Sequence, residues 1–383
     1  MASTQISDLR EEKKSLILRL FLGGGERTRR DIENVTGISY GTISIILRQL
    51  VAAGILRTVG KQSSQGGRRA DTYQLEPQAA IFGQVSVTAA YMRWCIRDTH
   101  GDTLEAGAVP DDNARDANET LQRTVSMMLS AATTLGPGFL ASIGVTVPGH
   151  YRGNQDRIVT AARERISELK IREIAHRTFD GPVHVESDVN AAALFEVGSL
   201  ESEPPETETT IYLTVTADGV GATLLIDRSI HYGAAGHAGE VHMLPIQLGN
   251  ATSRFGGLVD VEAVAKRIQE REGQDSPPDI HTLREMIMNS SSPTEEEYPV
   301  IVEAYAQALY LLDCVIDPHV VILAGPYVGF GRRFCEDIRT RIASFAESDL
   351  LENLTIRLAP NAEDLDQQGM WRMQATEWFT SLD

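Results

Sequence analysis

The sequence predicts an α/β protein in which a small, mostly helical and basic unit precedes a larger body of alternating strands and helices. Three observations support this prediction. The first 75 residues carry apolar positions at helical spacing, whereas from Ile81 onward short apolar runs typical of strands alternate with helical segments. The charge changes sign between the two parts. With 383 residues, the chain is also too long for one ordinary core, so two or three domains are expected.

The charge is divided unevenly along the chain, whose net charge of −18 by itself disfavours binding to nucleic acid. Residues 1–75 contain 12 Lys and Arg against 7 Asp and Glu, a net charge of +5. The remaining residues contain 23 against 46, a net charge of −23. A basic unit on an acidic body suggests two functions in one chain.

The cysteines and the apolar runs indicate where the protein works. Cys95, Cys314 and Cys335 are scattered and odd in number, which argues against a disulfide framework and against a cysteine-rich zinc site. No apolar run is long enough to span a membrane, and the start MASTQISDLREEKK lacks the apolar core of an export signal. We therefore expect a cytoplasmic protein with no membrane contact.

The first two predicted helices have clear boundaries. The segment 9–22 is expected to bury one face, and the glycines at 23–25 end it. Thr28 and Asp31 have the spacing of a capping box for a second helix, which ends at Gly37. The expected buried positions of the first helix are Leu16, Ile17, Leu20 and Phe21.

A third helix and two strands complete this unit. Ser39 is the expected N-cap, and Gly54 closes the helix. Strands are expected at Ile55–Leu56 and Thr72–Leu75, on either side of a Gly/Ser/Arg-rich hairpin. The buried face of the helix is Ile43, Ile46, Leu47 and Leu50. Helix, short turn with glycine, helix and a two-stranded wing make a winged helix-turn-helix. The alternative is a three-helix bundle used for packing or dimerisation.

The winged pattern predicts the DNA contacts. The exposed face of the third helix would enter the major groove through Ser39, Tyr40, Thr42, Ser44, Ile45 and Arg48. Because this face is poor in Arg, base reading would rely on hydroxyl groups and on apolar contact with thymine methyls. The expected phosphate contacts are Arg27, Arg29, Arg30 and Lys61. Arg68 and Arg69 lie in a flexible basic segment suited to a narrow minor groove, unless it is only a solvated linker.

The body pattern is that of an α/β protein with two lobes. Residues 83–104 read as a hairpin that turns at His100–Asp102, and 211–226 as a second hairpin that turns at 217–219. Further strands are expected at 141–149, 182–188 and 320–325, and helices at 190–197 and near 296–316. No internal repeat is evident.

Six segments carry a resemblance to a known family. They are residues 36–56, GGRR at 66–69, IGVTVPG at 143–149, VESDVNAAALFEVG at 185–198, the stretch 219–246 with GAAGHAGE, and VVILAG at 320–325. In this order they resemble the ROK family of repressors and sugar kinases, whose body is a two-lobed actin-like (ribonuclease H-like) sugar-kinase fold. The resemblance implies a winged helix-turn-helix at 1–75, a first lobe at 76–190 and a second at 191–383, and leaves open that the C-terminal helix returns to the first lobe.

The phosphate-binding elements of the family's kinases are altered here. The D-x-G-x-T loop reads Val85–Ala89, without the Asp and the Gly. The G-T-G-x-G turn reads Thr216–Gly221, where Asp218 adds negative charge in place of N–H donors. The last glycine run reads Ala324–Pro326, and proline has no N–H. We therefore expect no enzyme activity and no cofactor. The family's zinc-binding cysteine cluster is matched by 249–260, which has no cysteine, so no metal is expected.

The sugar-binding side is partly kept. The resemblance implies effector contacts from Gly149, Ser187, Asp188, Glu240 and His242. The family has Asn where Ser187 stands, one more residue in its E-x-G-H motif, and Glu where Val259 stands. Two acids without an evident Arg nearby favour a neutral or amino sugar over a sugar phosphate. Asp188 is also explained as a relic that stabilises a helix start.

The sequence thus predicts a transcriptional regulator, most simply a repressor, that binds double-stranded operator DNA as a homodimer or dimer of dimers. A sugar-type effector would act through the body. A ligand-independent or partner-controlled DNA binder is the alternative, and an active sugar kinase ranks third.

Overall fold

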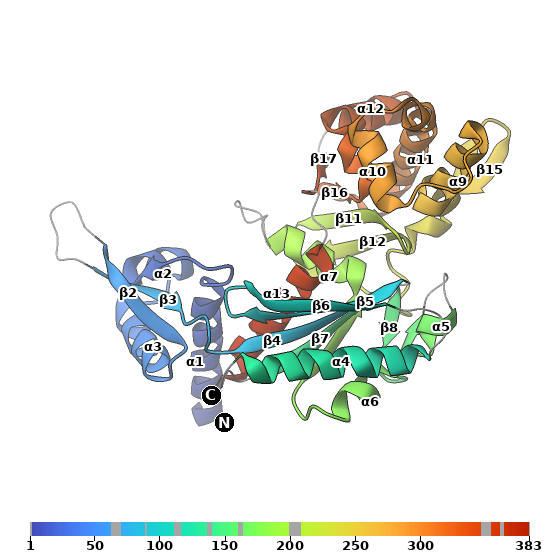
Figure 1. The fold of residues 1–383 in the computed structure, drawn as a ribbon. Coiled ribbons are helices and arrows are strands. Elements are labelled where there is room, and N and C mark those ends of the chain that lie inside the picture. The colour runs from blue at the N-terminus through green and yellow to red at the C-terminus, as the bar shows by residue number, and fades with distance from the viewer. Residues whose placement is uncertain are drawn as a thin grey trace. The chain divides into compact units, whose positions relative to one another are not determined.

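A computed structural model describes residues 2–62, 70–88, 90–110, 116–135, 140–159, 164–198, 208–345, 354–360 and 364–382 (Figure 1). The chain forms two compact units. Unit 1 is Met1–Ala191 together with Asp366–Asp383, and unit 2 is Ala192–Leu365. The chain crosses from one to the other within α7 (Asp188–Gly198) and at the start of α13 (Leu365–Ser381).

Unit 1 begins with three helices and a small sheet, which we call the head (residues 1–75). The helices are α1 (Ala2–Arg19), α2 (Arg29–Thr36) and α3 (Tyr40–Ala52). The sheet has the order β1-β3-β2 and consists of β1 (Arg27–Thr28), β2 (Leu56–Gln62) and β3 (Ala70–Leu75). The order of helices and wing strands is as predicted, but β1 was not expected, and β2 is longer than the two residues assigned to it.

The local signals of the head are largely confirmed. Thr28 and Asp31 form the predicted capping box, and the C-cap of α2 is Gly37 in the left-handed region. The predicted buried face of α3 is at most 2% exposed. One position in α1 was wrong: Leu16 is 44% exposed, whereas Leu18 is fully buried beside Ile17 and Phe21.

The larger part of unit 1 is built on a five-stranded sheet of order β10-β7-β4-β5-β6. Its strands are β4 (Ile81–Val87), β5 (Tyr91–Asp98), β6 (Thr103–Pro110), β7 (Leu140–Val147) and β10 (Val183–Ser187). β4, β5 and β6 pair antiparallel in succession, while β7 pairs parallel with β4 and β10 pairs parallel with β7. The stretch 83–98 was taken as one arm of a hairpin, but it holds β4 and β5 with a turn between them.

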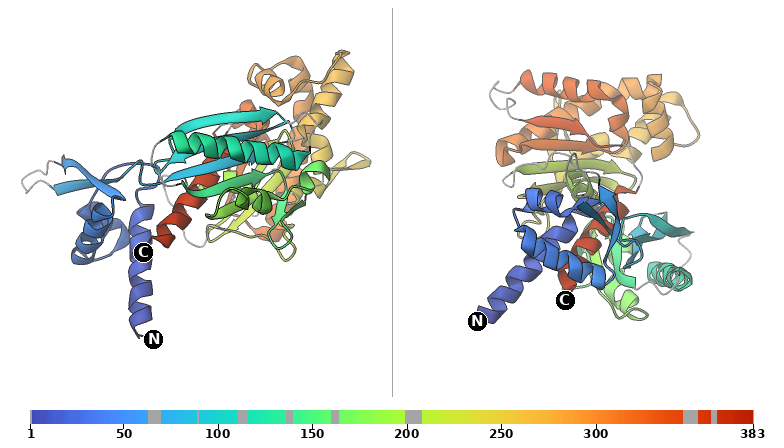
Figure 2. Two further views of the ribbon diagram at one scale, coloured as in Figure 1. Left: turned by 60° about the horizontal axis from the view of Figure 1, so that its bottom comes forward. Right: turned by 90° about the vertical axis from the view of Figure 1, so that its left-hand side faces the viewer.

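The central strand β4 is buried on both faces, so its two sets of alternating side chains meet different helices. Ile81 and Val85 pack in a cluster with α4 (Ala117–Thr134). Phe82 and Gln84 face the other way, toward α13. The helices α4 and α13 accordingly cover opposite faces of the sheet (Figures 1 and 2).

Smaller elements complete unit 1. They are the two-stranded sheet of β8 (His150–Arg152) and β9 (Arg157–Val159), and the short helices α5 (Glu164–Ser167) and α6 (Ile171–His176). Ile171 and Ile174 of α6 add to the cluster beneath α4.

Unit 2 repeats the topology of the sheet in unit 1. Its sheet has the order β13-β12-β11-β16-β17, with strands β11 (Thr209–Thr216), β12 (Gly219–Ile226), β13 (Ser229–Ile230), β16 (Val320–Ala324) and β17 (Thr355–Leu358). Again three strands pair antiparallel in succession and two parallel strands follow on the other side. Two lobes of one topology are therefore present although no sequence repeat was evident.

Helices and one further strand pair surround the sheet of unit 2. They are β14 (Pro245–Leu248), β15 (Ala251–Arg254), α8 (Phe255–Val259), α9 (Val261–Glu272), α10 (Ile280–Met288), α11 (Ser292–Ile316), α12 (Arg332–Ala343) and the 3-10 turns η1 (Val241–Met243) and η2 (Pro326–Phe330). α11 is the one helix, within the described ranges, that is long and apolar enough to cross a membrane by those measures alone. It contains Pro299, and Ala304 and Tyr305 are buried in the core of the unit.

Candidate DNA-binding and effector-binding sites

The outward face of α3 carries the residues predicted to read DNA. Tyr40 and Ile45 are 52% and 49% exposed, on a helix whose other face is buried. Ser39 is the N-cap residue, but its hydroxyl lies 3.0 Å from the Thr42 hydroxyl and caps no backbone group. Ser44 Oγ donates to the Tyr40 carbonyl at 2.8 Å, and Arg48 is exposed. An apolar and hydroxyl-bearing face is thus held on a rigid core.

The three arginines before and within α2 differ in their freedom. Arg30 is exposed, and Arg27 is half-buried. Arg29 donates a hydrogen bond to the Tyr73 hydroxyl, and its guanidinium lies over the Tyr73 ring and 3.6 Å from Asp71. Arg29 therefore joins α2 to the wing strand β3, a role that the sequence reasoning did not assign to it.

The basic wing is described only in part. Lys61 lies in β2, where its backbone is paired with Asp71 of β3. Arg68 and Arg69 lie outside the described residues.

In unit 1 the predicted effector residues follow two adjacent parallel strands. Ser187 at the end of β10 is in register with Val147 at the end of β7. Gly149, with φ of 113°, and Asp188 therefore both follow the same edge of the sheet. Ligands of α/β folds bind at the carboxyl ends of parallel strands, so this edge is where a small molecule is expected.

Asp188 is the first residue of α7, two residues earlier than the predicted helix start. Its carboxylate accepts a hydrogen bond from Val189 N at 2.8 Å, as expected of an acid at a helix N-terminus. Glu186, 7% exposed, accepts from Ser187 N at 2.8 Å and from Asn190 Nδ2 at 2.9 Å. Glu186 thus stabilises the turn between β10 and α7, whereas Asp188 lies at the edge of the sheet.

In unit 2 the predicted residues are paired with each other. His242 Nδ1 lies 2.9 Å from Glu240 Oε2, so the shortened motif brings the imidazole and the carboxylate together. Their side chains are 25% and 37% exposed, so both remain accessible. Val259, the family's Glu position, is fully buried, and Asp260 beside it accepts from Glu262 N at 2.8 Å as the N-cap of α9. Burial raises the pKa of Asp260.

The two phosphate-side turns of unit 2 are also resolved. Asp218 lies in the β11–β12 turn, where its backbone N donates to Thr216 Oγ1 at 3.2 Å. Gly325 has φ of 91°, and a Cβ there would lie 2.3 Å from the Val215 carbonyl oxygen. The glycine is thus kept for close packing of two neighbouring strands, and Pro326 follows it at the start of η2.

Asp366 is a residue that sequence reasoning missed. Its carboxylate accepts hydrogen bonds from Ser86 Oγ at 2.7 Å and from Thr146 Oγ1 at 2.6 Å. Ser86 belongs to the segment that matches the family's first phosphate loop. A carboxylate held there adds negative charge to the loop from the far end of the chain. The position of this acid in the first turn of the last helix was the available signal.

An ion-pair cluster lies beside the segment that matches the cysteine cluster. Arg267 donates to the Leu258 carbonyl at 2.7 Å and to Glu297 at 2.8 Å. Arg271 donates to the same carboxylate, and Glu297 is 2% exposed. Two arginines and one buried acid therefore hold the end of α8.

Comparison with known proteins identifies similar repressors and similar sugar kinases. The ROK family model matches residues 83–375. The xylose repressor of Caldicellulosiruptor bescii is 24% identical over 235 residues, which are 61% of this chain and 58% of that protein. The chain therefore spans less than two thirds of that relative. The xylose repressor of Bacillus spizizenii is 22% identical over 284 residues, 72% of each chain.

Solved structures share the fold. A crystal structure described as a ROK family transcriptional regulator, homolog of E. coli MLC protein, superposes with a TM-score of 0.75 at 14% identity, covering 97% of this chain and 98% of that one. The ROK hexokinase from Thermus thermophilus gives a TM-score of 0.58 at 20% identity, covering 76% of this chain and 96% of that one. At these identities the likeness concerns the fold. The family match, which spans most of the body, shows that this chain belongs to the ROK family.

Proposed function

We propose that the protein is a DNA-binding transcriptional repressor of the ROK family, with residues 1–75 as its DNA-binding domain. The observation that carries this proposal is the outward face of α3, where Tyr40 and Ile45 are about half exposed on a helix whose opposite face is fully packed. The positive charge of the head and the repressor names of its relatives support it. The repressor would act in the cytoplasm, as a homodimer or dimer of dimers on a two-fold operator.

We further propose that the body does not phosphorylate sugars. Two carboxylates, Asp366 beside Ser86 and Asp218 in the β11–β12 turn, add negative charge to segments that hold phosphate in the kinases. Pro326 supplies no N–H to the third. These features support a body that no longer holds ATP productively. Incubation with ATP, magnesium and hexoses should give no ADP above background, and turnover that Asp188→Asn abolishes would contradict this.

The body is proposed to sense a neutral or amino sugar. In unit 1 the proposed contacts are Gly149, Ser187 and Asp188, and in unit 2 Glu240 and His242 offer the same kind of hydrogen-bonding groups. Carboxylates accept from two hydroxyls at once, and a neutral imidazole both donates and accepts. A ligand-independent or partner-controlled repressor is the second candidate, favoured by Val259, a buried apolar residue where the family has Glu. A thermal-shift screen of sugars, amino sugars and their phosphates separates these two.

Selection of full-length protein on a random DNA library tests DNA binding directly. We expect one enriched two-fold sequence, with affinity that falls steeply with salt because each neutralised phosphate contributes about 0.9 to the log–log slope. Ile45→Ala should change the selected bases by removing apolar contact, and Arg30→Ala should lower the salt slope instead. The matched control is Val35→Ala, which removes an exposed apolar side chain from α2. Failure to enrich any sequence would sink the proposal.

A further inference from the structure

The start of α13 lies directly against α7. A Cβ added to Gly369 would sit 1.7 Å from the carbonyl oxygen of Ala191, far inside any real contact. Only glycine allows this approach, so the two helix backbones touch at this point. Ala191 lies one turn after Asp188, in the part of α7 that belongs to unit 1. A displacement of the first turn of α7 would therefore push directly against α13.

The middle of α13 packs closely on the sheet and is hydrogen-bonded to it. A Cβ on Gly144 of β7 would lie 2.4 Å from Met370, so the side chain fills the space above that glycine. Gln374, 1% exposed, donates to the Gly83 carbonyl at 3.2 Å and accepts from Gln84 at 3.1 Å. A buried and satisfied polar network of this kind fixes one helix position. These contacts join the middle of α13 to β4 and β7.

The end of α13 lies inside the head. Phe379 is fully buried in the same apolar cluster as residues of α1, α2 and α3, and Trp378 and Leu382 pack against that cluster. Lys14 of α1 donates to the Leu382 carbonyl. The hydrophobic core of the head is thus completed by the last residues of the chain.

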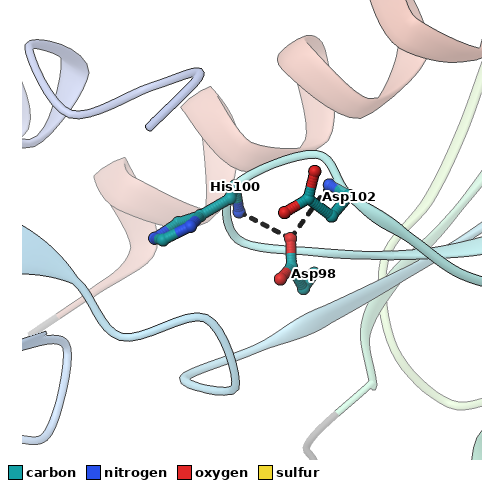
Figure 3. A group of neighbouring side chains, drawn as sticks. All are labelled: Asp98, His100 and Asp102. Atoms are coloured by element: carbon teal, nitrogen blue, oxygen red, sulfur yellow. Dashed lines mark hydrogen bonds between the residues drawn. The ribbon is translucent and has the colours of Figure 1, made fainter. Parts of the chain in front are cut away.

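A second connection runs through the turn between β5 and β6, whose residues Asp98, His100 and Asp102 are drawn in Figure 3. Trp371 Nε1 donates to the Asp98 carbonyl at 2.9 Å. On its other side the turn holds the segment that leaves the head, since Thr99 Oγ1 donates to the Glu76 carbonyl at 2.7 Å and His100 Nε2 lies 2.9 Å from the Leu75 carbonyl. α13 therefore reaches the head both directly and through this turn.

The same turn groups three side chains of kinds that ligate metals. Oxygen and nitrogen atoms of Asp98, His100 and Asp102 lie within 4.8 Å of one another. Asp98 Oδ1, however, accepts from the backbone N of His100 at 2.8 Å and of Asp102 at 3.0 Å. These are the hydrogen bonds of a tight turn, and they explain the grouping.

We propose that α13 is the element that transmits a displacement of the first turn of α7 to the DNA-binding head. Its regulatory use rests on the proposed effector at Asp188. The mechanical link does not, because it depends only on contacts within unit 1. An effector that moves Asp188 would shift Ala191 against Gly369, and the shift would arrive at Phe379, about 15 Å further along the helix at about 1.5 Å per residue.

Hydrogen exchange of the full-length protein, without DNA or sugar, tests the link. Gly369→Ala forces a methyl group against the Ala191 carbonyl. We expect amides of α3 to exchange about fivefold faster or more, the lower end of ordinary coupling between sites. Gly257→Ala is the matched control, a helical glycine of α8 with nothing within 4 Å of its added Cβ. It should leave α3 unchanged.

The helix α4 is the internal reference, because it packs on the opposite face of the sheet from α13. Faster exchange in α3 than in α4 supports transmission. An equal rise in both helices means general loss of stability in unit 1, and a rise confined to α7 means that nothing is transmitted. Either result overturns the proposal. These exchange rates can be measured even if no operator is found.

A second variant guards against a first that does not fold. Trp371→Phe keeps an aromatic ring beside Gly101 but removes the donor to Asp98. The amide of Thr99, which donates to the Pro77 carbonyl, should exchange faster, together with amides of α3. Unchanged exchange throughout the head would remove the second connection from the proposal.

Discussion

Asp366 Oδ2 accepts a hydrogen bond from Ser86 Oγ at 2.7 Å, joining the first turn of the last helix to a strand 280 residues earlier in the chain. Ser86 is 2% exposed, and its hydroxyl has the carboxylate as its partner. The contact closes unit 1 and at the same time places a negative charge beside the segment where the family's kinases hold phosphate.

Asp366→Asn should lower the free energy of unfolding by about 1–3 kcal/mol, because Ser86 and Thr146 both donate to Oδ2, and a neutral amide oxygen accepts more weakly than a carboxylate, to which a hydrogen bond is worth about 1.5–3 kcal/mol. Urea unfolding of full-length protein measures this. Asp180→Asn, at an exposed position of the same unit, is the control and should stay near wild type. Equal urea midpoints for the two variants would mean that the hydrogen bonds from Ser86 and Thr146 do not require a charged acceptor.

Glu297→Gln should destabilise unit 2 by about 2–4 kcal/mol, because two guanidinium groups then face a buried neutral amide. Glu295→Gln removes an exposed partner of Arg333 and should cost about 0–1 kcal/mol.

Protein purified without chelator should contain no stoichiometric zinc, and EDTA should leave its thermal midpoint unchanged. A chelator-sensitive midpoint would show that the ion-pair cluster does not replace a metal.

Asp188→Ala should weaken binding of a sugar found in the thermal-shift screen by about tenfold to a hundredfold, since about 1.4 kcal/mol corresponds to one decade. Operator affinity in the absence of sugar should stay nearly unchanged. Calorimetric titration of wild type, Asp188→Ala and the exposed-site control Asp180→Ala provides the comparison. Equal affinities for all three would place the ligand elsewhere, and no sugar hit would favour Asp188 as a helix-start residue.

His184 makes the stability of unit 1 depend on pH. Its Nδ1 lies 3.1 Å from Glu377 Oε2 on α13. Burial lowers the pKa of His184 below its ordinary value of 6.5, with Glu377 opposing this effect and Arg172 adding to it. The unfolded chain therefore binds the proton more readily than the folded one, and stability is lost as pH falls from above 6.5 toward the lowered pKa.

Unfolding midpoints at pH 8 and pH 6 test this dependence. Wild type should lose more stability between these values than His184→Gln, which cannot titrate. Raised carboxyl pKa values elsewhere, such as that of Glu196, are common to both proteins and cancel in the comparison. Parallel losses in the two proteins would contradict the assignment to His184.

Local chemistry in the sequence determined much of the head and of the strand edges. The capping box at Thr28 and Asp31 and the buried face of α3 follow from spacings of three and four residues, which depend on the geometry of one helix. The position of Asp188 between a strand and a helix is equally local, and it was correct to within two residues of the helix start.

Only the tertiary structure decided which distant segments share a surface. Leu18 rather than Leu16 is buried because the orientation of α1 is set by a core that includes Phe379 from the other end of the chain. Asp366 meets Ser86 because α13 packs on the sheet of unit 1, and spacing along the chain carries no information about that return. The spacing of hydrophobic residues specifies which face of a helix or strand is buried. The element that covers this face is decided by packing between segments that lie far apart in the sequence.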